Sequence, residues 1–173
     1  MSLVVQNKMS KKIHSRDLNF SIQEWITSIL SVPNPTFNNL PACPYAKQAW
    51  LDNKVIIKTF NNFVDAYSEI VTRQYNFDEY DVLVYAFPPT LTPEQLSNSV
   101  DYLNEKWPHS DVVILEDHPH ELEAVKGFRL NFGESCLLLI QSRSKLNKAR
   151  SELEQKGYYK NWSKKYKDEV QDR

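Results

Sequence analysis

Four short apolar runs, separated by segments with helical spacing, constrain the fold of this chain more than any other feature. The runs are Lys54–Phe60, Asp81–Phe87, Asp111–Leu115 and Cys136–Gln141. Their length and their Val, Ile and Leu content predict strands that are buried on both faces or nearly so. Strands that alternate with helices predict right-handed crossovers and parallel neighbours. We therefore expect one α/β domain with about four mostly parallel strands.

Helix signals lie on either side of these runs. The capping box Ser21-Ile-Gln-Glu24 predicts an N-terminal helix over residues 21–30. Pro44 suits the first position of a second helix, and Thr92-Pro93-Glu94-Gln95 predicts another helix start. Gly157 predicts the end of a basic C-terminal helix. The expected helices cover about residues 21–30, 44–52, 62–75, 92–107 and 144–156, and Asn61 or Asn62 is the expected cap of the third. Residues 116–135 carry no clear signal beyond one helical turn over Leu122–Val125.

Length and composition favour a single domain in a reducing compartment. The 173 residues are 41% hydrophobic and 25% charged, as in ordinary globular proteins. We expect a flexible tail over residues 1–18, the α/β domain over 19–157 and a basic aromatic tail over 158–173. No apolar stretch has the length of a signal-peptide core or a membrane span. The chain has only two cysteines, and such sparse use of cysteine suits a reducing compartment. The sequence thus predicts a soluble cytoplasmic protein without a membrane partner.

Glycine content excludes one class of cofactor. The chain has three glycines, Gly127, Gly133 and Gly157. Loops that hold phosphates need clustered glycines so that the backbone can approach the ligand. The sequence therefore contains no nucleotide or dinucleotide motif. A divalent metal is the one cofactor that other residues of the chain, Cys43 and the segment 116–121, still suggest.

The charges are strongly separated along the chain. Residues 65–123 contain 13 acidic residues against Arg73 and Lys106, a net charge of −11. Residues 143–167 contain nine basic residues against Glu152 and Glu154, a net charge of +7. The two regions either pair with one another or present a charged face to a partner.

The segment Ala42-Cys43-Pro44-Tyr45-Ala46-Lys47 is the sharpest candidate for catalysis. A cysteine just before a helix meets unpaired amides and the positive end of the helix dipole, which lower the pKa of a thiol. Lys47 lies one turn further on and adds positive charge. Cys43 is therefore the candidate nucleophile, with Lys47 as its supporting cation. The alternative is that Cys43 is a small buried residue under a loop.

This segment carries two resemblances. Cys43-Pro44-Tyr45 is similar to the active-site motif of glutaredoxins, with Ala46 where a second cysteine would stand. Leu40-Pro-Ala-Cys43-Pro44-Tyr45-Ala46 also resembles the Leu-Cys-Pro-Phe-Ala element of an uncharacterised bacterial family. In that family an N-terminal helix precedes the element, and a strand and two helix–strand units follow it. That order resembles residues 21–155 here, although Pro41-Ala42 is inserted and residues 116–135 diverge. The family resemblance implies a fold and no activity.

Glu116-Asp117-His118-Pro119-His120-Glu121 follows the third expected strand. Ligands of open α/β sheets usually sit at the carboxyl ends of the strands. Two imidazoles flanked by carboxylates suit zinc or iron, or supply a general base. If this segment meets Cys43, the metal ligands would be His118, His120, Glu116 and Cys43, or Cys43 and an imidazole would form a catalytic pair. The alternative is a polar surface loop.

The C-terminal segment combines cations with aromatic rings. Lysines neutralise phosphates and aromatic rings stack on bases, so the segment suits a nucleic acid or an acidic protein. The candidate binding residues are Lys148, Lys160, Trp162, Lys164 and Lys165. The alternative is a solvated helix whose aromatic rings pack the tail against the domain and whose positive charges balance the acidic region.

Two functions from different classes follow. The first is a thiol- or metal-dependent enzyme that uses Cys43 with His118 and His120. The second is a non-catalytic module that binds nucleic acid or an acidic protein through the basic aromatic segment. A third is an accessory protein that recognises a partner through the acidic region.

Overall fold

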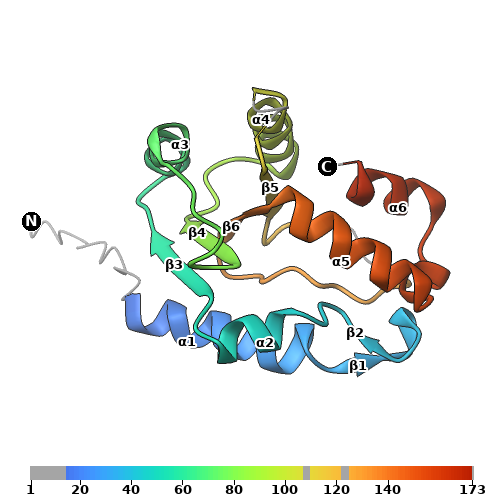
Figure 1. Ribbon diagram of the computed structural model, residues 1–173. Helices are drawn as coiled ribbons and strands as arrows, with labels where there is room; N and C mark the ends of the chain where they lie inside the picture. Colours follow the sequence, from blue (N-terminus) through green and yellow to red (C-terminus); the bar gives the residue numbers. More distant parts are fainter. Residues whose placement is uncertain (1–14, 107–109, 122–124, 173) are drawn as a thin grey trace, which may run out of the picture.

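A computed structural model describes residues 15–106, 110–121 and 125–172 of the chain (Figure 1). The α-helices are α1 (Ser15–Trp25), α2 (Ala46–Leu51), α3 (Phe63–Thr72), α4 (Pro93–Lys106), α5 (Arg143–Gln155) and α6 (Lys164–Gln171). Short helical segments are the π-helix η1 (Ile26–Leu30) and the 3-10 helices η2 (Pro35–Phe37) and η3 (Tyr158–Asn161). The strands are β1 (Pro33–Asn34), β2 (Leu40–Pro41), β3 (Val55–Thr59), β4 (Val82–Phe87), β5 (Val112–Asp117) and β6 (Cys136–Ser142).

The main sheet has four strands in the order β3-β4-β6-β5. Strands β3 and β4 are parallel, whereas β6 is antiparallel to both β4 and β5. All four strands coincide with the apolar runs of the sequence, so the α/β class is confirmed. The prediction of mostly parallel neighbours is wrong, because two of the three neighbouring pairs are antiparallel.

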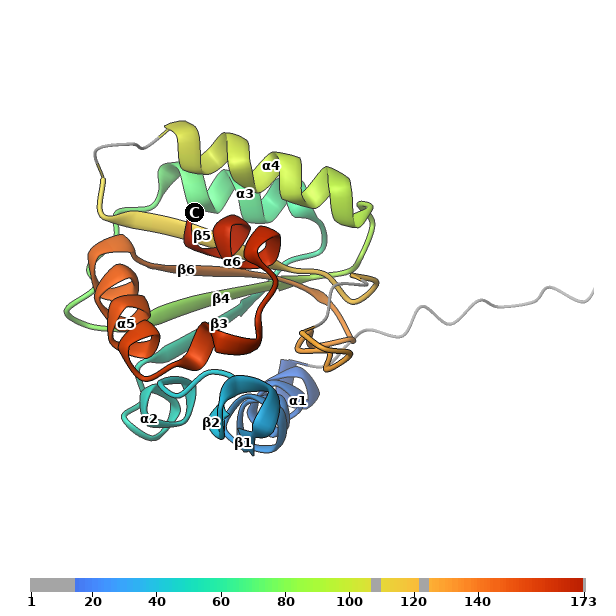
Figure 2. The same cartoon turned by 90° about the vertical axis from the view of Figure 1, so that its right-hand side faces the viewer.

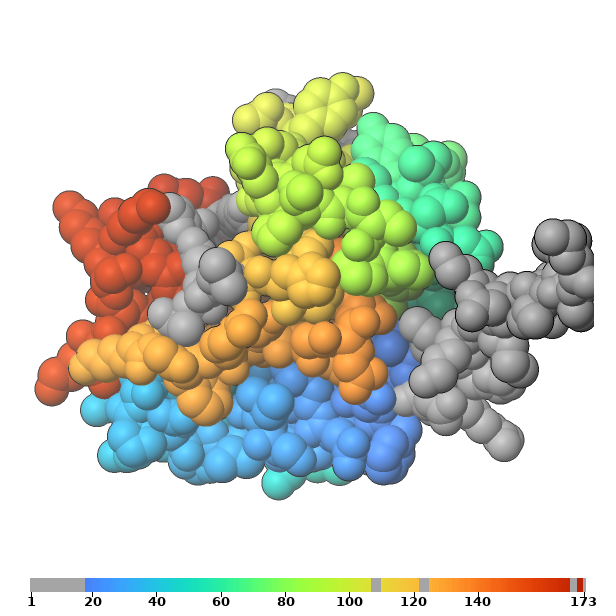
Figure 3. Space-filling model, turned by 180° about the vertical axis from the view of Figure 1, so that it is seen from behind, coloured from blue at the N-terminus to red at the C-terminus, as the bar shows by residue number. Residues whose placement is uncertain are grey.

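The position of β6 explains this difference. Strands β3, β4 and β5 run in one direction, as the alternation with helices indicates, but β6 enters between β4 and β5 in the opposite direction. The chain reaches β6 through residues 118–135, which contain no long helix in the part that the structure describes. The orange segment in Figure 3, which includes the described end of this connection, lies between the N-terminal segments and α4. Strand order of this kind is not encoded in the apolar pattern.

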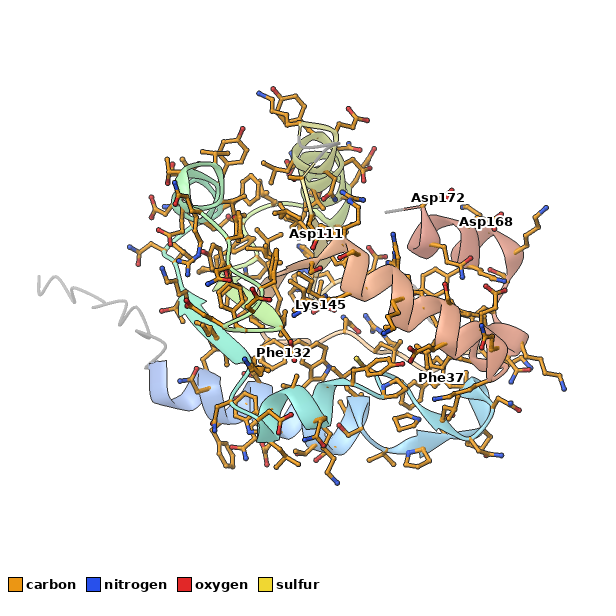
Figure 4. All side chains as sticks on the ribbon, viewed as in Figure 1. Phe37, Asp111, Phe132, Lys145, Asp168 and Asp172 are labelled. Atoms are coloured by element: carbon orange, nitrogen blue, oxygen red, sulfur yellow. The ribbon has the colours of Figure 1, made fainter. Side chains whose placement is uncertain are left out.

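The sheet is covered on both faces (Figure 2). Helices α3 and α4 cover one face, where Leu138 and Ile140 of β6 lie in the core. Segments α1 and η1 cover the other face, where the neighbouring residue Leu137 packs with Trp25 and Phe132. Figure 4 labels Phe132 on this side of the sheet. Successive residues of β6 therefore enter different cores, as the pleat of a strand requires.

Several predicted helix ends are confirmed by their hydrogen bonds. Thr92 Oγ1 accepts from the Gln95 N–H at 3.2 Å, and Gln95 Oε1 accepts from the Thr92 N–H at 2.9 Å, which forms the expected capping box. Asn62 caps α3 by accepting from the Asp65 N–H at 2.9 Å. Gly157 follows α5 with φ of 75°, the left-handed conformation that glycine adopts without strain.

The N-terminal helix differs from its prediction. Helix α1 begins at Ser15, within the segment expected to be a tail, and Ser21 lies inside it. The last five residues, Ile26–Leu30, form a π-helix. The expected helix start at Pro44 is also wrong, because α2 begins at Ala46 and is preceded by a turn at Pro44 and Tyr45.

An aromatic cluster joins the two ends of the described chain. Phe37, between the small strands β1 and β2, stacks on Tyr158 of η3 with ring centroids 5.4 Å apart, and it meets Trp162 at 6.1 Å. Asn161 Nδ2 donates to the carbonyls of Pro35 and Thr36 at 3.2 and 3.0 Å. Figure 4 labels Phe37 beneath the far end of α5. We call this group the terminal clasp.

Parts of the prediction fall outside the described residues. The tail over residues 1–14 and most of the helical turn over Leu122–Val125 are among them. Within the described ranges, no helix has both the length and the apolar character needed to cross a bilayer.

The central position of β6 predicts that shortening a side chain on this strand lowers the free energy of unfolding more than shortening one at the surface. Leu138 is fully buried, whereas Leu51 at the end of α2 is 62% exposed. We expect Leu138→Ala to lower the free energy of unfolding by about 2–5 kcal/mol, because it leaves a cavity in the core. Leu51→Ala, the matched control, should change that energy by less than about 0.5 kcal/mol. Urea unfolding followed by circular dichroism measures both, and equal effects would contradict this placement of β6.

Candidate functional site

A cavity of about 420 Å³ lies against the face of the sheet covered by α1. Its floor is formed by Val82 and Val84 of β4 and Leu139 of β6. The surrounding walls come from α1, η1 and α2, near the start of the described chain, and from α5, much later in the sequence. In Figure 1, α1 and α2 lie below α5. The cavity is therefore assembled from both ends of the chain.

The π-helix η1 holds one wall in place. Ile26 and Leu30 line the cavity, and the Leu30 carbonyl accepts from the Cys43 N–H at 2.7 Å. Trp25, just before η1, also lines the cavity and donates from Nε1 to the Leu130 carbonyl at 2.8 Å. Single π-helical turns are rare and are frequent at functional sites. Here the π-turn fixes the loop that carries Cys43.

Cys43 lies in this wall, but its electrostatics differ from the expectation. Burial raises the pKa of the Cys43 thiol, and the backbone N–H groups of Ala46 and Tyr45 only partly oppose that effect. The predicted lowering of this pKa is therefore wrong. The sulfur loses more hydration than the two amides replace, and α2, which starts three residues later and has six residues, offers a weak dipole. Cys43 is a protonated thiol at neutral pH.

Lys47 does not support the thiol in the expected way. It is exposed on α2 and does not line the cavity. The polar groups that do line it come from elsewhere. Tyr45 donates its hydroxyl to Glu152 Oε2 at 3.0 Å, and Lys145 Nζ lies 3.8 Å from Asp81 Oδ1. Figure 4 labels Lys145 near the start of α5, on the side toward the strands.

His118 lies near the other end of the sheet. In the strand register, Asp117 is opposite Leu137, whereas the cavity residue Gln141 is opposite Val82 at the start of β4. His118 follows Asp117 and is 3% exposed. The structure therefore does not bring Cys43 and His118 into one site.

Both ring nitrogens of His118 already have partners. Nδ1 accepts from the His120 N–H at 3.0 Å, so the ring proton lies on Nε2, which donates to the Leu91 carbonyl at 2.9 Å. The His120 ring is exposed, and its centroid lies 5.3 Å from that of His118. This geometry ties the loop after β5 to the loop before α4. Because both ring nitrogens are occupied, the geometry favours a structural role for His118 over a role as a general base.

The metal hypothesis has little geometric support. In the described ranges, no three His, Cys, Asp or Glu side chains are placed to hold one metal ion. Of the candidate ligands, Glu116 and His118 are at one end of the sheet and Cys43 lines the cavity. A metal bound through His118 would have to displace one of its two backbone hydrogen bonds.

The basic aromatic segment separates its charges from its rings. Lys148, Lys160, Lys164 and Lys165 are exposed. Trp162, in contrast, stacks on Tyr166 at 4.8 Å and packs in the terminal clasp, so its faces are occupied. This arrangement agrees with the alternative that the rings pin the tail to the domain. Of the candidate binding residues, Lys148 is the one that also lines the cavity.

Sequence reasoning missed Tyr45, Gln141 and Glu152 as site residues. A signal existed for the wall of α5, because Lys145, Ala149 and Glu152 recur at helical spacing and share one face. Nothing in the sequence tells which structure that face meets. The cavity therefore becomes visible only when α2 and α5 are placed on the sheet.

Asp117 generates a prediction about pH. Burial raises the pKa of Asp117 to about 6, helped by Glu116 and Glu121 and opposed by the hydrogen bond from the Phe132 N–H. The unfolded chain loses this proton near pH 3.9. The folded state therefore holds more protons between about pH 4 and pH 6, and this group lowers stability as pH rises through that window.

Asp117→Asn should remove this penalty and keep an oxygen for the Phe132 N–H. We expect its free energy of unfolding, relative to wild type, to rise by on the order of 2 kcal/mol between pH 4 and pH 7. Urea unfolding at a series of pH values measures the difference. Asp52→Asn, at an exposed position of the chain, is the control. An Asp117→Asn difference that does not vary with pH would contradict the raised pKa.

Cys43 generates a second prediction. Because its thiol has a raised pKa, iodoacetamide at pH 7.5 should modify Cys43 more slowly than it modifies N-acetylcysteine. The rate should increase with pH, because the thiolate is the nucleophile. Mass spectrometry identifies the site, and Cys43→Ser supplies the background from the buried Cys136. Rapid modification below pH 7 would restore the original expectation of a reactive thiolate.

Comparison with known proteins adds no relative. No protein-family model, no curated protein sequence and no solved structure matches this chain. The resemblances of Cys43-Pro44-Tyr45 to glutaredoxins and of Leu40–Ala46 to a bacterial family therefore stay predictions. The functional argument rests on the geometry of the cavity.

Proposed function

We propose that this protein binds a small, largely apolar molecule in the cavity between the sheet, η1, α2 and α5. The observation that carries the proposal is the cavity itself. Its volume of about 420 Å³ lies within the range of small-molecule sites. Such sites usually have apolar walls and a few polar groups that orient the ligand, and this cavity has both.

Small side chains leave this space open. Ala46 and Ala49 of α2 and Ala149 of α5 line the cavity from two helices. Larger residues at these positions would fill the gap, because protein interiors normally pack as densely as organic crystals. The apolar floor of Val82, Val84 and Leu139 then offers a surface whose burial by a ligand is favourable.

Cys43 serves in this proposal as part of the wall. A protonated thiol is a soft, weakly polar contact for an apolar ligand. Nucleophilic catalysis would need a base beside the sulfur. The described groups that set the pKa of Cys43 are backbone amides and burial, without an imidazole. The geometry thus supports a binding protein better than a thiol-dependent enzyme.

Filling the cavity tests the proposal. The probe is N-phenyl-1-naphthylamine, a neutral dye whose fluorescence rises in apolar surroundings. We expect wild type to bind it at one site and Ala149→Phe to weaken binding at least about tenfold, a loss of roughly 1.4 kcal/mol. Ser151→Phe, which is exposed on the same helix and does not line the cavity, should bind as wild type does.

Protection of Cys43 gives a second readout that does not depend on a variant. Because Cys43 lines the cavity, a bound dye should slow its modification by iodoacetamide in wild type. The dissociation constant obtained from protection should equal the one from fluorescence. Saturating dye without any protection, or Ala149→Phe binding as tightly as wild type, would place the dye elsewhere and refute the proposal.

A further inference from the structure

We propose that the ligand is an amphiphile with an acidic head group, whose apolar body fills the cavity while its head is held by Lys148 and Gln141. This inference rests on the proposed function and goes beyond it by naming the chemical class of the ligand. It follows from how the polar groups around the cavity are partnered.

The two carboxylates that line the cavity already have donors. Glu152 Oε2 accepts from the Tyr45 hydroxyl at 3.0 Å. Asp81 Oδ1 lies 3.8 Å from Lys145 Nζ, and the same ammonium donates to the Phe77 carbonyl. Lys145 is thus committed to groups of the protein. A cationic head group would have to compete for carboxylates that are already engaged.

Lys148 is in a different position. It lines the cavity from α5, on the turn between Lys145 and Glu152, and its side chain is exposed at the surface. Within the residues that the structure describes, its ammonium forms neither an ion pair within 4.0 Å nor a hydrogen bond. A bound anion would gain a charged partner there without displacing another one.

Gln141 supplies the second donor. It lies on β6 two residues after Leu139, so its side chain points to the same face of the sheet, and it lines the cavity. Its amide has no hydrogen-bond partner among the described residues. The amide N–H groups can donate to an acidic oxygen, and a hydrogen bond to a charged group is stronger than a neutral one.

Together these contacts define an order inside the site. The apolar residues of β4, β6 and η1 meet the body of the ligand, whereas Gln141 and Lys148 meet its head. Long acids with a hydrocarbon or aromatic body have this division. Because an ammonium acts as a point charge, Lys148 distinguishes anions from neutral and cationic groups but not one acid from another.

Matched decyl ligands separate this inference from the proposed function. Decanoate, decanol and decyltrimethylammonium share one body and differ in charge, and each is titrated against wild type loaded with N-phenyl-1-naphthylamine. We expect decanoate to displace the dye at a concentration at least about threefold lower than decanol, since a partly exposed charged hydrogen bond contributes a modest free energy. The preference should shrink as sodium chloride is raised.

Variants assign the preference to residues. In Lys148→Gln, decanoate and decanol should displace the dye at equal concentrations, each scaled to the dye affinity of that variant. Lys160→Gln, which removes an exposed lysine that does not line the cavity, should keep the full preference. In Gln141→Leu, with the same scaling, the preference for decanoate over decanol should be smaller than in wild type.

The outcomes are distinguishable. If the dye binds but decanoate displaces it no better than decanol, or decyltrimethylammonium displaces it best, the inference fails and the proposed function stands. If Lys148→Gln keeps the preference for decanoate, the head does not sit at Lys148 and the inference fails. If the dye does not bind wild type at all, the proposed function and the inference fail together.

Discussion

Strand β6 determines the rest of the structure, because it is paired on both sides and buried on both faces. Residues 136–141 pair with β4 and residues 137–142 pair with β5. A slip by one residue would move Leu138 and Ile140 from the α3–α4 core to the opposite face. The same slip would turn Leu139 and Gln141 away from the cavity. The register of one strand therefore sets both cores and one wall of the candidate site.

The cavity exists because the helices over this face of the sheet carry small side chains, Ala46 and Ala49 on α2 and Ala149 on α5. Helix α2 has six residues, fewer than an isolated helix needs to be stable in water. The loop before it is held by hydrogen bonds from the Cys43 N–H to the Leu30 carbonyl, from the Tyr158 hydroxyl to the Ala42 carbonyl and from the Tyr45 hydroxyl to Glu152. A helix of this length keeps its place through such contacts outside itself.

The sequence predicted correctly those features that depend on interactions between residues close together in the chain. The four apolar runs became strands, and the caps at Thr92, Asn62 and Gly157 formed as expected, since each depends on neighbours within a few residues. The position of β6 depended on a connection, residues 118–135, whose described residues form no long helix. The environment of Cys43 depended on packing against η1, which raised its pKa where the helix start alone predicted a lower one. His-x-His suggested a metal, but backbone groups distant in sequence took one ring nitrogen. Site chemistry was therefore less predictable than the fold.

The terminal clasp has a consequence for how the molecule is made. A ribosome releases the chain from its N-terminus, and domains fold as their parts emerge. Phe37 meets its stacking partners only when Tyr158 and Trp162 have left the exit tunnel, more than a hundred residues later. Until then α1, η1 and α2 lack both the clasp and the α5 wall. The nascent protein would thus hold its strands before it holds a finished pocket, and it could capture ligand only after residues 143–162 have emerged.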